Sequence, residues 1–184
     1  MRGMTETPGA VERVDPPLAA GETSTLVAFL NYHRDTLRLK TEGLDAAGLD
    51  TRLAPSTMTL GGLLKHLALV EDQWFSVVLL GNEPAEPWRD VDWDADRDWE
   101  WHTASQDTPE RLRRLLDDAI DASDRCVGLA LSDDGLDQLS VRESRRQGGR
   151  LSLRWILVHM IEEYARHNGH ADLIRESVDG VTGE

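Results

Sequence analysis

A short segment near the C-terminus, running from His159 to His170, contains three of the six histidines of the chain. His159, Glu163 and His167 are spaced four residues apart, so their side chains would lie one above the other on a helix. Imidazole and carboxylate groups together are the ligands that a catalytic zinc-type site uses. The segment therefore predicts a metal site, although it does not have the His-Glu-x-x-His pattern of zinc proteases.

A helical wheel separates the members of this segment. With His159 set at zero and about 100° per residue, Glu163 falls near ~40° and His167 near ~80°. Apolar side chains of the same segment cover roughly 60° to 160°. We therefore expect His167 to project into an apolar face with Glu163 beside it, while His159 and His170 lie toward the rim.

A third ligand is expected from another helix, because helix bundles build metal sites from side chains on facing helices. His66 lies at the edge of the apolar stripe of its own segment, and His33 is the competing candidate beside Phe29 and Leu37. A histidine at such an edge is also typical of a hydrogen-bonded boundary residue. A glutamate four residues before a histidine is also typical of a local polar pair, so both interpretations stay open on the residues alone.

The elements that must position these side chains are helical. Thr108 followed by Pro109 predicts a helix start with an N-cap and a proline at the first helical position. No alternating pattern predicts a strand. The sequence indicates an all-α four-helix bundle with long connecting loops. Apolar residues recur at helical spacing over four segments, from about Glu22 to Thr41, Thr59 to Leu80, Pro109 to Leu131 and Ser152 to Ser177.

The connection over residues 81–107 is long for a compact domain, and such loops are often functional. It contains four tryptophans among acidic residues. These tryptophans either form a lid over a pocket or fill a small additional core, and we favour the second interpretation. Trp74 and Cys126, which lie within helical patterns, are expected in the main core.

Length and composition restrict the class of protein. A chain of 184 residues predicts a single domain over residues 22–180, preceded by a flexible N-terminal segment over residues 1–21. The net charge of −14 argues against nucleic-acid and anionic-membrane partners, which require a basic surface. No apolar run approaches ~18 residues and no signal peptide is recognised, so we expect a cytoplasmic protein without a membrane span. A single cysteine fits that reducing compartment.

Four stretches of the chain resemble the DinB-like (DinB/YfiT) superfamily. Within that superfamily the chain is similar to an uncharacterised actinobacterial branch related to mycothiol-dependent maleylpyruvate isomerase. The resemblance covers nearly the whole chain past about residue 22. It is carried by Leu153–Arg175, by Thr59–Ala68, by Glu71–Phe75 and by the acidic, tryptophan-rich stretch Asp92–Trp101.

The resemblance implies a four-helix bundle that holds one divalent metal with three side chains. It implies His66 from the second helix and Glu163 and His167 from the last helix as the ligands. Many members have histidine at the position of Glu163. A glutamate there resembles the isomerase, whose metal ligands are two histidines and one glutamate. Many members end this motif in His-x-Gly-Gln, whereas this chain has His170 at the last position, so the role of His170 stays open.

The resemblance also implies a function, a metal-dependent thiol S-transferase or isomerase in which a metal-activated thiolate attacks an electrophilic small molecule. The thiol would be mycothiol. Zinc is the expected metal, with nickel, iron and manganese as alternatives. Two other functions stay open: a hydrolase that uses metal-bound hydroxide, and a non-enzymatic, stress-associated metal-binding bundle. A homodimer is a further expectation.

Four other side chains are candidates for roles around this site. Arg154 and Arg166 would clamp a substrate carboxylate, because a planar guanidinium matches carboxylate geometry. Solvated surface pairing in this acidic chain is the alternative for both. His159 and His170 are candidates for orienting a ligand or for acid–base work, with ordinary rim histidines as the alternative.

Overall fold

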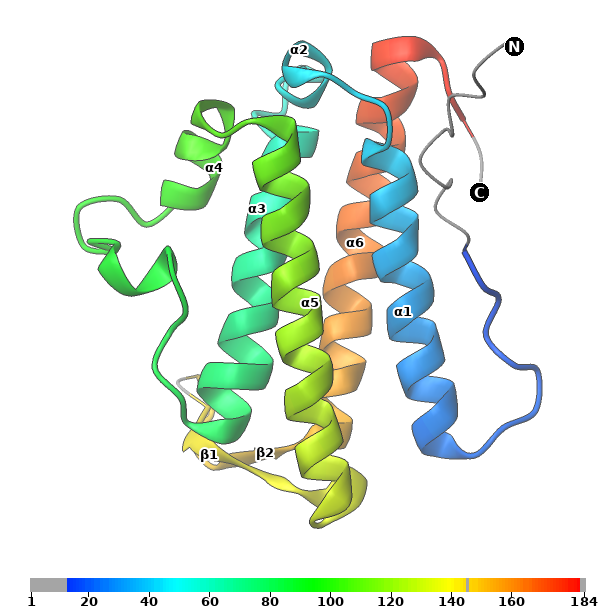
Figure 1. Cartoon of the computed structure of the whole chain (residues 1–184), viewed down its shortest axis with the longest axis vertical. Helices are drawn as coiled ribbons and strands as arrows, with labels where there is room; N and C mark the ends of the chain where they lie inside the picture. Colours follow the sequence, from blue (N-terminus) through cyan, green and yellow to red (C-terminus); the bar gives the residue numbers. More distant parts are fainter. Residues whose placement is uncertain (1–12, 145, 183–184) are drawn as a thin grey trace, which may run out of the picture.

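The computed structural model describes residues 13–144 and 146–182. In this part of the chain, long helices lie side by side (Figure 1), with α1 packed mainly on α6 and α3 mainly on α5. The predicted all-α bundle is thereby confirmed. The long elements are α1 (Glu22–Thr41), α3 (Leu60–Glu71) with its continuation η1 (Asp72–Leu79), α5 (Pro109–Ser132) and α6 (Leu153–Asp179).

Side-chain caps explain where three of the helices begin. The hydroxyl of Thr59 accepts from the backbone N–H of Gly62, and Ser152 caps α6 in the same way. Thr108 caps α5, and Pro109 occupies its first turn as predicted. Each cap satisfies a backbone donor that the helix itself leaves without a partner.

Apolar stripes from the long helices meet in one core. Leu37, Leu67 and Met160 are fully buried, and Leu116 and Cys126 are buried beside them. The expectation that Cys126 is a core residue is confirmed. This packing fixes α3 against α6, the two helices that carry the candidate ligands.

The second long helix departs from its prediction after Glu71. It continues as the π-helix η1, whose wider turn changes the direction in which successive side chains point. Trp74, predicted as a core residue, is only half-buried there: one side packs on the core and the other lines a cavity. Short π-helical stretches are frequent at functional sites.

A two-stranded hairpin, β1 (Leu139–Glu143) and β2 (Arg150–Ser152), closes one end of the bundle (Figure 1). The expectation that the chain has no strand is wrong at this point. The reason is an inverted pattern: Val141 is 55% exposed, whereas Ser140 is buried and donates to the backbone oxygen of Arg142. Apolar alternation cannot reveal a strand whose polar residue faces inward.

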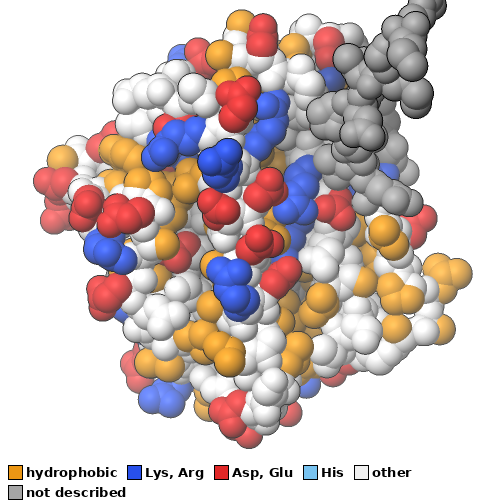
Figure 2. Space-filling model, viewed as in Figure 1, with side chains coloured by type: hydrophobic (Ala, Val, Ile, Leu, Met, Phe, Trp, Pro, Cys, Tyr) orange, Lys and Arg blue, Asp and Glu red, His pale blue; other side chains and the backbone are white. Residues whose placement is uncertain are grey.

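The long connection between η1 and α5 contains short helices rather than a featureless loop. Trp88 is 3% exposed and packs edge-to-face on Trp99. The other loop tryptophans pack, half-buried, against the main core, which supports the favoured interpretation that they are packing residues. Figure 2 shows acidic side chains gathered over this connection. Its helices are η2 (Trp88–Asp90), α4 (Trp99–Thr103) and η3 (Ala104–Gln106).

The N-terminal segment predicted to be flexible lies partly outside the described residues, which begin at Arg13. The guanidinium of Arg13 lies over the ring of Tyr32 and donates to Thr36, so this end of the segment contacts α1. Among the described helices, none combines the length and the apolar character that crossing a bilayer requires.

Candidate metal centre

Three predicted ligands come together between α3 and α6. His66 projects from α3, and Glu163 and His167 project from successive turns of α6. One ligand atom from each lies within 4.8 Å of the other two. The rings of His66 and His167 meet edge to face with their centroids 5.0 Å apart. The structure thus places side chains that are about 100 positions apart in the chain around one point.

The arrangement fits a divalent metal. Nε2 of His167 lies 3.5 Å from Oε2 of Glu163. Ligand atoms of a tetrahedral zinc site are separated by about 3.4 Å, since each metal–ligand bond is about 2.1 Å long. Nδ1 of His167 is buried and has no hydrogen-bond partner in the described part of the chain. The other ring nitrogen, Nε2, faces Glu163 and is the one available to a metal.

The carboxylate of Glu163 carries the charge that such a site needs. Its contact with His167 lowers its pKa below the ordinary value, more than partial burial raises it, and His159 and His66 add to the lowering. Glu163 is therefore ionised at neutral pH. An ionised carboxylate next to two imidazoles is a ligand set typical of catalytic zinc.

His66 is held on its far side by two residues of α4. Its Nδ1 lies 2.9 Å from Oε1 of Glu100, and its ring stacks on Trp101 with the centroids 4.7 Å apart. Since Nδ1 is engaged by the carboxylate, Nε2 is the nitrogen that remains for a metal. Glu100 was not predicted from the sequence. Its only signal was its position between Trp99 and Trp101 in an acidic loop.

The stacked tryptophan depends on a glycine in α3. A Cβ atom at Gly62 would lie 2.7 Å from Cε3 of Trp101, closer than such contacts allow. We expect Gly62→Ala to displace Trp101 from His66 and to destabilise the protein by about 1–3 kcal/mol, as overpacking does. Urea unfolding measures this change. Gly128→Ala is the control, because a Cβ there meets nothing within 4 Å, and equal stability losses in the two variants would contradict the expectation.

The other predicted histidines lie around the cluster but outside it. His33 on α1 accepts through its backbone oxygen from Asn168, and it is not part of the cluster. His170 packs beside His167, and burial lowers its pKa, so it is a neutral imidazole at neutral pH. Nε2 of His159 lies 3.6 Å from Oε1 of Glu163. His167 is buried, as the wheel predicts. The side chain of His159, predicted toward the rim, is 19% exposed and so less exposed than that of Glu163, at 27%.

The two predicted arginines differ in their surroundings. Arg154 lies at the start of α6, where it donates to Glu22 and Asp137. That placement offers no support for its prediction as a substrate clamp. Arg166 pairs with Glu162 at 2.7 Å and lines the same cavity as Trp74 and Glu163.

Comparison with known protein families agrees with the geometry of the site. A family model described as mycothiol-S-transferase matches residues 25–180, which include all three clustered residues. The chain belongs to the mycothiol S-transferase family. This family is part of the DinB-like superfamily, so the predicted membership is confirmed. Comparison with curated proteins finds no match.

Membership in the mycothiol S-transferase family supports two coarse statements. The family acts with a small-molecule thiol, and DinB-like proteins of this kind are metalloproteins in general. The clustered imidazoles and carboxylate are the part of this chain that suits a metal. The identity of the metal and the second substrate follow from neither statement.

A cavity of about 590 Å³ opens beside Glu163. Its size is typical of small-molecule sites. Trp74 and Trp155 form an aromatic wall, with the ring of His159 stacked on Trp155 at a centroid distance of 5.0 Å. The hairpin supplies the opposite, polar side through residues that include Arg142, and Trp155 is 43% exposed. The cavity therefore borders the candidate metal site at Glu163.

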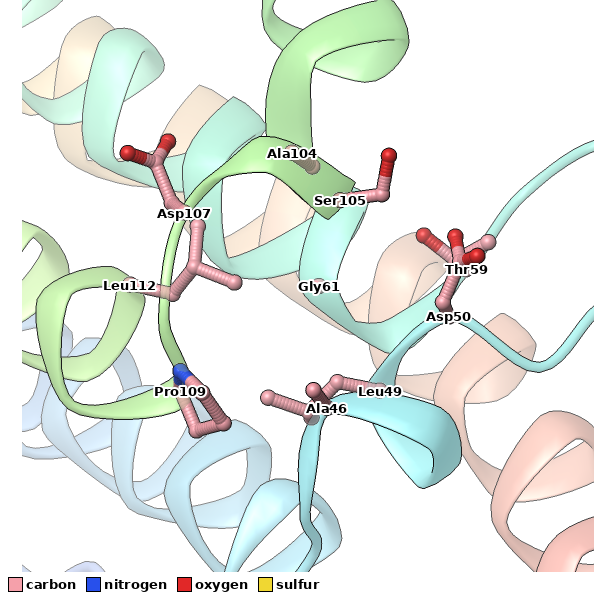
Figure 3. A pocket seen from close by; sticks show the side chains of 10 residues that line it. All are labelled: Ala46, Leu49, Asp50, Thr59, Gly61, Ala104, Ser105, Asp107, Pro109 and Leu112. Atoms are coloured by element: carbon pink, nitrogen blue, oxygen red, sulfur yellow. The ribbon is translucent and has the colours of Figure 1, made fainter.

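A second cavity, at the opposite end of α3, is much smaller. It holds about 20 Å³ between α2 (Ala46–Leu49), the start of α3 and the start of α5, enough for about one water molecule. Figure 3 shows the side chain of Asp107 at its edge. That carboxylate is already engaged by Lys65 and Arg111. This cavity is too small for a substrate.

Proposed function

We propose that this member of the family is a metal-dependent mycothiol S-transferase with His66, Glu163 and His167 as the metal ligands. The observation that carries the proposal is the meeting of these three side chains from α3 and α6 within 4.8 Å. Two imidazoles and one carboxylate are typical of catalytic zinc, which keeps a position for substrate. Zinc is therefore the proposed metal, with nickel, iron and manganese as the alternatives to test.

A bound divalent metal would lower the pKa of a thiol and so supply a thiolate near neutral pH. The protein's own side chains then have two tasks. The aromatic wall of Trp74 and Trp155 binds the apolar part of the electrophile next to Glu163. His159 lies between this wall and Glu163, so its imidazole is the group best placed to accept the thiol proton.

The transfer can be written for monochlorobimane as the electrophile. The sulfur of mycothiol forms a bond to the carbon that carries chlorine, the carbon–chlorine bond breaks, and chloride leaves. The thiol proton passes to His159 and from there to solvent. The product is a fluorescent thioether, so turnover is measured directly. No oxidant or reductant is required.

The test uses full-length protein purified without an affinity tag. We expect about one zinc per chain by elemental analysis, and thioether formation that requires both mycothiol and the metal. Chelation should abolish turnover and added zinc should restore it. Protein that binds metal but gives no thioether would support the non-enzymatic alternative, and turnover of an ester without any thiol would support the hydrolase.

Trp155 provides a test of the cavity. We expect Trp155→Ala to raise the KM for monochlorobimane about two- to tenfold, because an aromatic contact contributes about 0.5–1.5 kcal/mol beyond simple burial. Zinc content should not change, since Trp155 is not a ligand. Phe29→Ala is the matched control: Phe29 is also 43% exposed but lies on α1, away from this cavity. An unchanged KM in Trp155→Ala would place the electrophile elsewhere.

A further inference from the structure

Among the described residues, Glu100 has a buried carboxylate with one oxygen unpartnered. It belongs to α4, yet only 4% of the residue is exposed. Oε1 lies 2.9 Å from Nδ1 of His66, and Oε2 is buried without a hydrogen-bond partner in the described part of the chain. Burying a carboxylate is costly unless it is paired. His66 is the partner that the structure provides.

We propose that Glu100 is a positioning residue of the metal site, a proposal that rests on the metal-binding function proposed above. The carboxylate accepts a hydrogen bond from Nδ1–H of His66, which fixes the imidazole in the tautomer whose Nε2 is open toward Glu163 and His167. Metal-binding histidines commonly donate their second ring nitrogen to a carboxylate in this way, and the contact sets the orientation of the ring.

The way α4 is attached to α3 supports this role. Lys65, the neighbour of His66, is 3% exposed. Its ammonium group donates to Thr103 and to Asp107 at 2.9 and 2.6 Å, and it lies 4.3 Å from the ring centroid of Trp99. Two of these contacts, to Thr103 and Trp99, dock α4 next to His66, and the third holds Asp107 at the end of the same connection. The docking holds the carboxylate of Glu100 at a fixed place relative to the imidazole.

The stacking of Trp101 on His66 acts in the same direction. The two rings are inclined by 27°, and Trp101 also lies 6.1 Å from the ring of His167. The imidazole of His66 is therefore restrained in its plane by Glu100 and across its face by Trp101. The long connection before α5 has a definite task on this interpretation: it delivers a carboxylate and an indole to a metal ligand.

The same connection offers a matched control. Nδ1 of His102 lies 2.9 Å from Oδ2 of Asp96, the same distance as between His66 and Glu100. The side chain of His102 is 65% exposed, and the pair is not part of the ligand cluster. Removing the carboxylate at Asp96 changes a histidine–carboxylate contact without touching the site.

The experiment compares Glu100→Gln, Glu100→Ala and Asp96→Asn with the wild-type full chain. Zinc affinity is measured by competition with a chromophoric chelator, and the visible absorption of the cobalt-substituted proteins reports ligand geometry. We expect Glu100→Gln to weaken zinc binding about 10- to 100-fold and to alter the cobalt spectrum. Asp96→Asn should match the wild type. Thermal unfolding of the metal-free proteins should show no loss of stability in Glu100→Gln, which removes a buried charge.

Two results would overturn the proposal. The first is zinc affinity within twofold of wild type together with an unchanged cobalt spectrum in Glu100→Gln; the proposed ligands would then stand without this support. The second is a loss of zinc affinity that parallels a loss of stability of the metal-free protein, which would make Glu100 a structural residue only. A wild-type protein that binds no zinc or cobalt would instead refute the metal-binding function itself.

Discussion

Replacing His167 by alanine is expected to leave the purified protein without bound metal. His167 is the most buried of the three proposed ligands, and its ring contacts both His66 and Glu163. Losing a direct ligand should weaken zinc binding by more than the roughly 100-fold that changes in supporting residues reach. Thioether formation should fall with the metal content. Elemental analysis and chelator competition measure the first effect, and the monochlorobimane assay measures the second.

The control for this prediction is His33→Ala. His33 is the other histidine that the sequence offered as a ligand, and it is half-buried on α1 beside Asn168. We expect this variant to keep its zinc and its activity. Glu163→Gln should lose zinc as His167→Ala does, because the amide carries no charge. Full zinc occupancy in His167→Ala would refute the proposed ligand set. Loss of zinc in His33→Ala alone would place the metal site at α1 instead.

Helical spacing was sufficient to predict that the last helix buries His167. The angular positions of Glu163 and His167 follow from 3.6 residues per turn, and the burial of His167 agrees with them. The choice of His66 over His33 needed the family resemblance, because both lie at the edge of an apolar stripe. Only the packing of α3 on α6 brings His66 to the cluster.

Glu100 shows why the surroundings of the site could not be predicted. It is one of several acidic residues in a connection without periodicity, and nothing local distinguishes it from its solvated neighbours. Its burial arises from a long-range contact between α4 and α3, made through Lys65. The π-helix at Asp72–Leu79 and the hairpin with its inward Ser140 were missed for a similar reason: tertiary contacts decide both, and the local apolar pattern does not report them.

The largest stability effect is expected from breaking the buried ion pair between Arg34 and Glu71. Two hydrogen bonds of 2.7 Å join the guanidinium to the carboxylate, and the two side chains are 1% and 0% exposed. The hydroxyl of Tyr164 donates to the same carboxylate at 2.8 Å; burial raises its pKa well above the ordinary value, so it stays protonated as a donor. This network links α1, α3 and α6, and Tyr164 is the neighbour of Glu163. It therefore sets the placement of the two helices that carry the proposed ligands.

We expect Arg34→Met to lower the free energy of unfolding by about 3–5 kcal/mol, because it leaves the charge of Glu71 buried without its cation. Adding Glu71→Gln should recover part of this loss, since the amide is neutral and still accepts from Tyr164. Arg38→Met is the control: its pair with Asp117 is exposed, with side-chain exposures of 29% and 53%, and should contribute about 0–1 kcal/mol. Urea unfolding with a chelator present measures all of these, because bound metal would add its own stabilisation. Equal losses in the two arginine variants would show that burial does not decide the contribution of this pair.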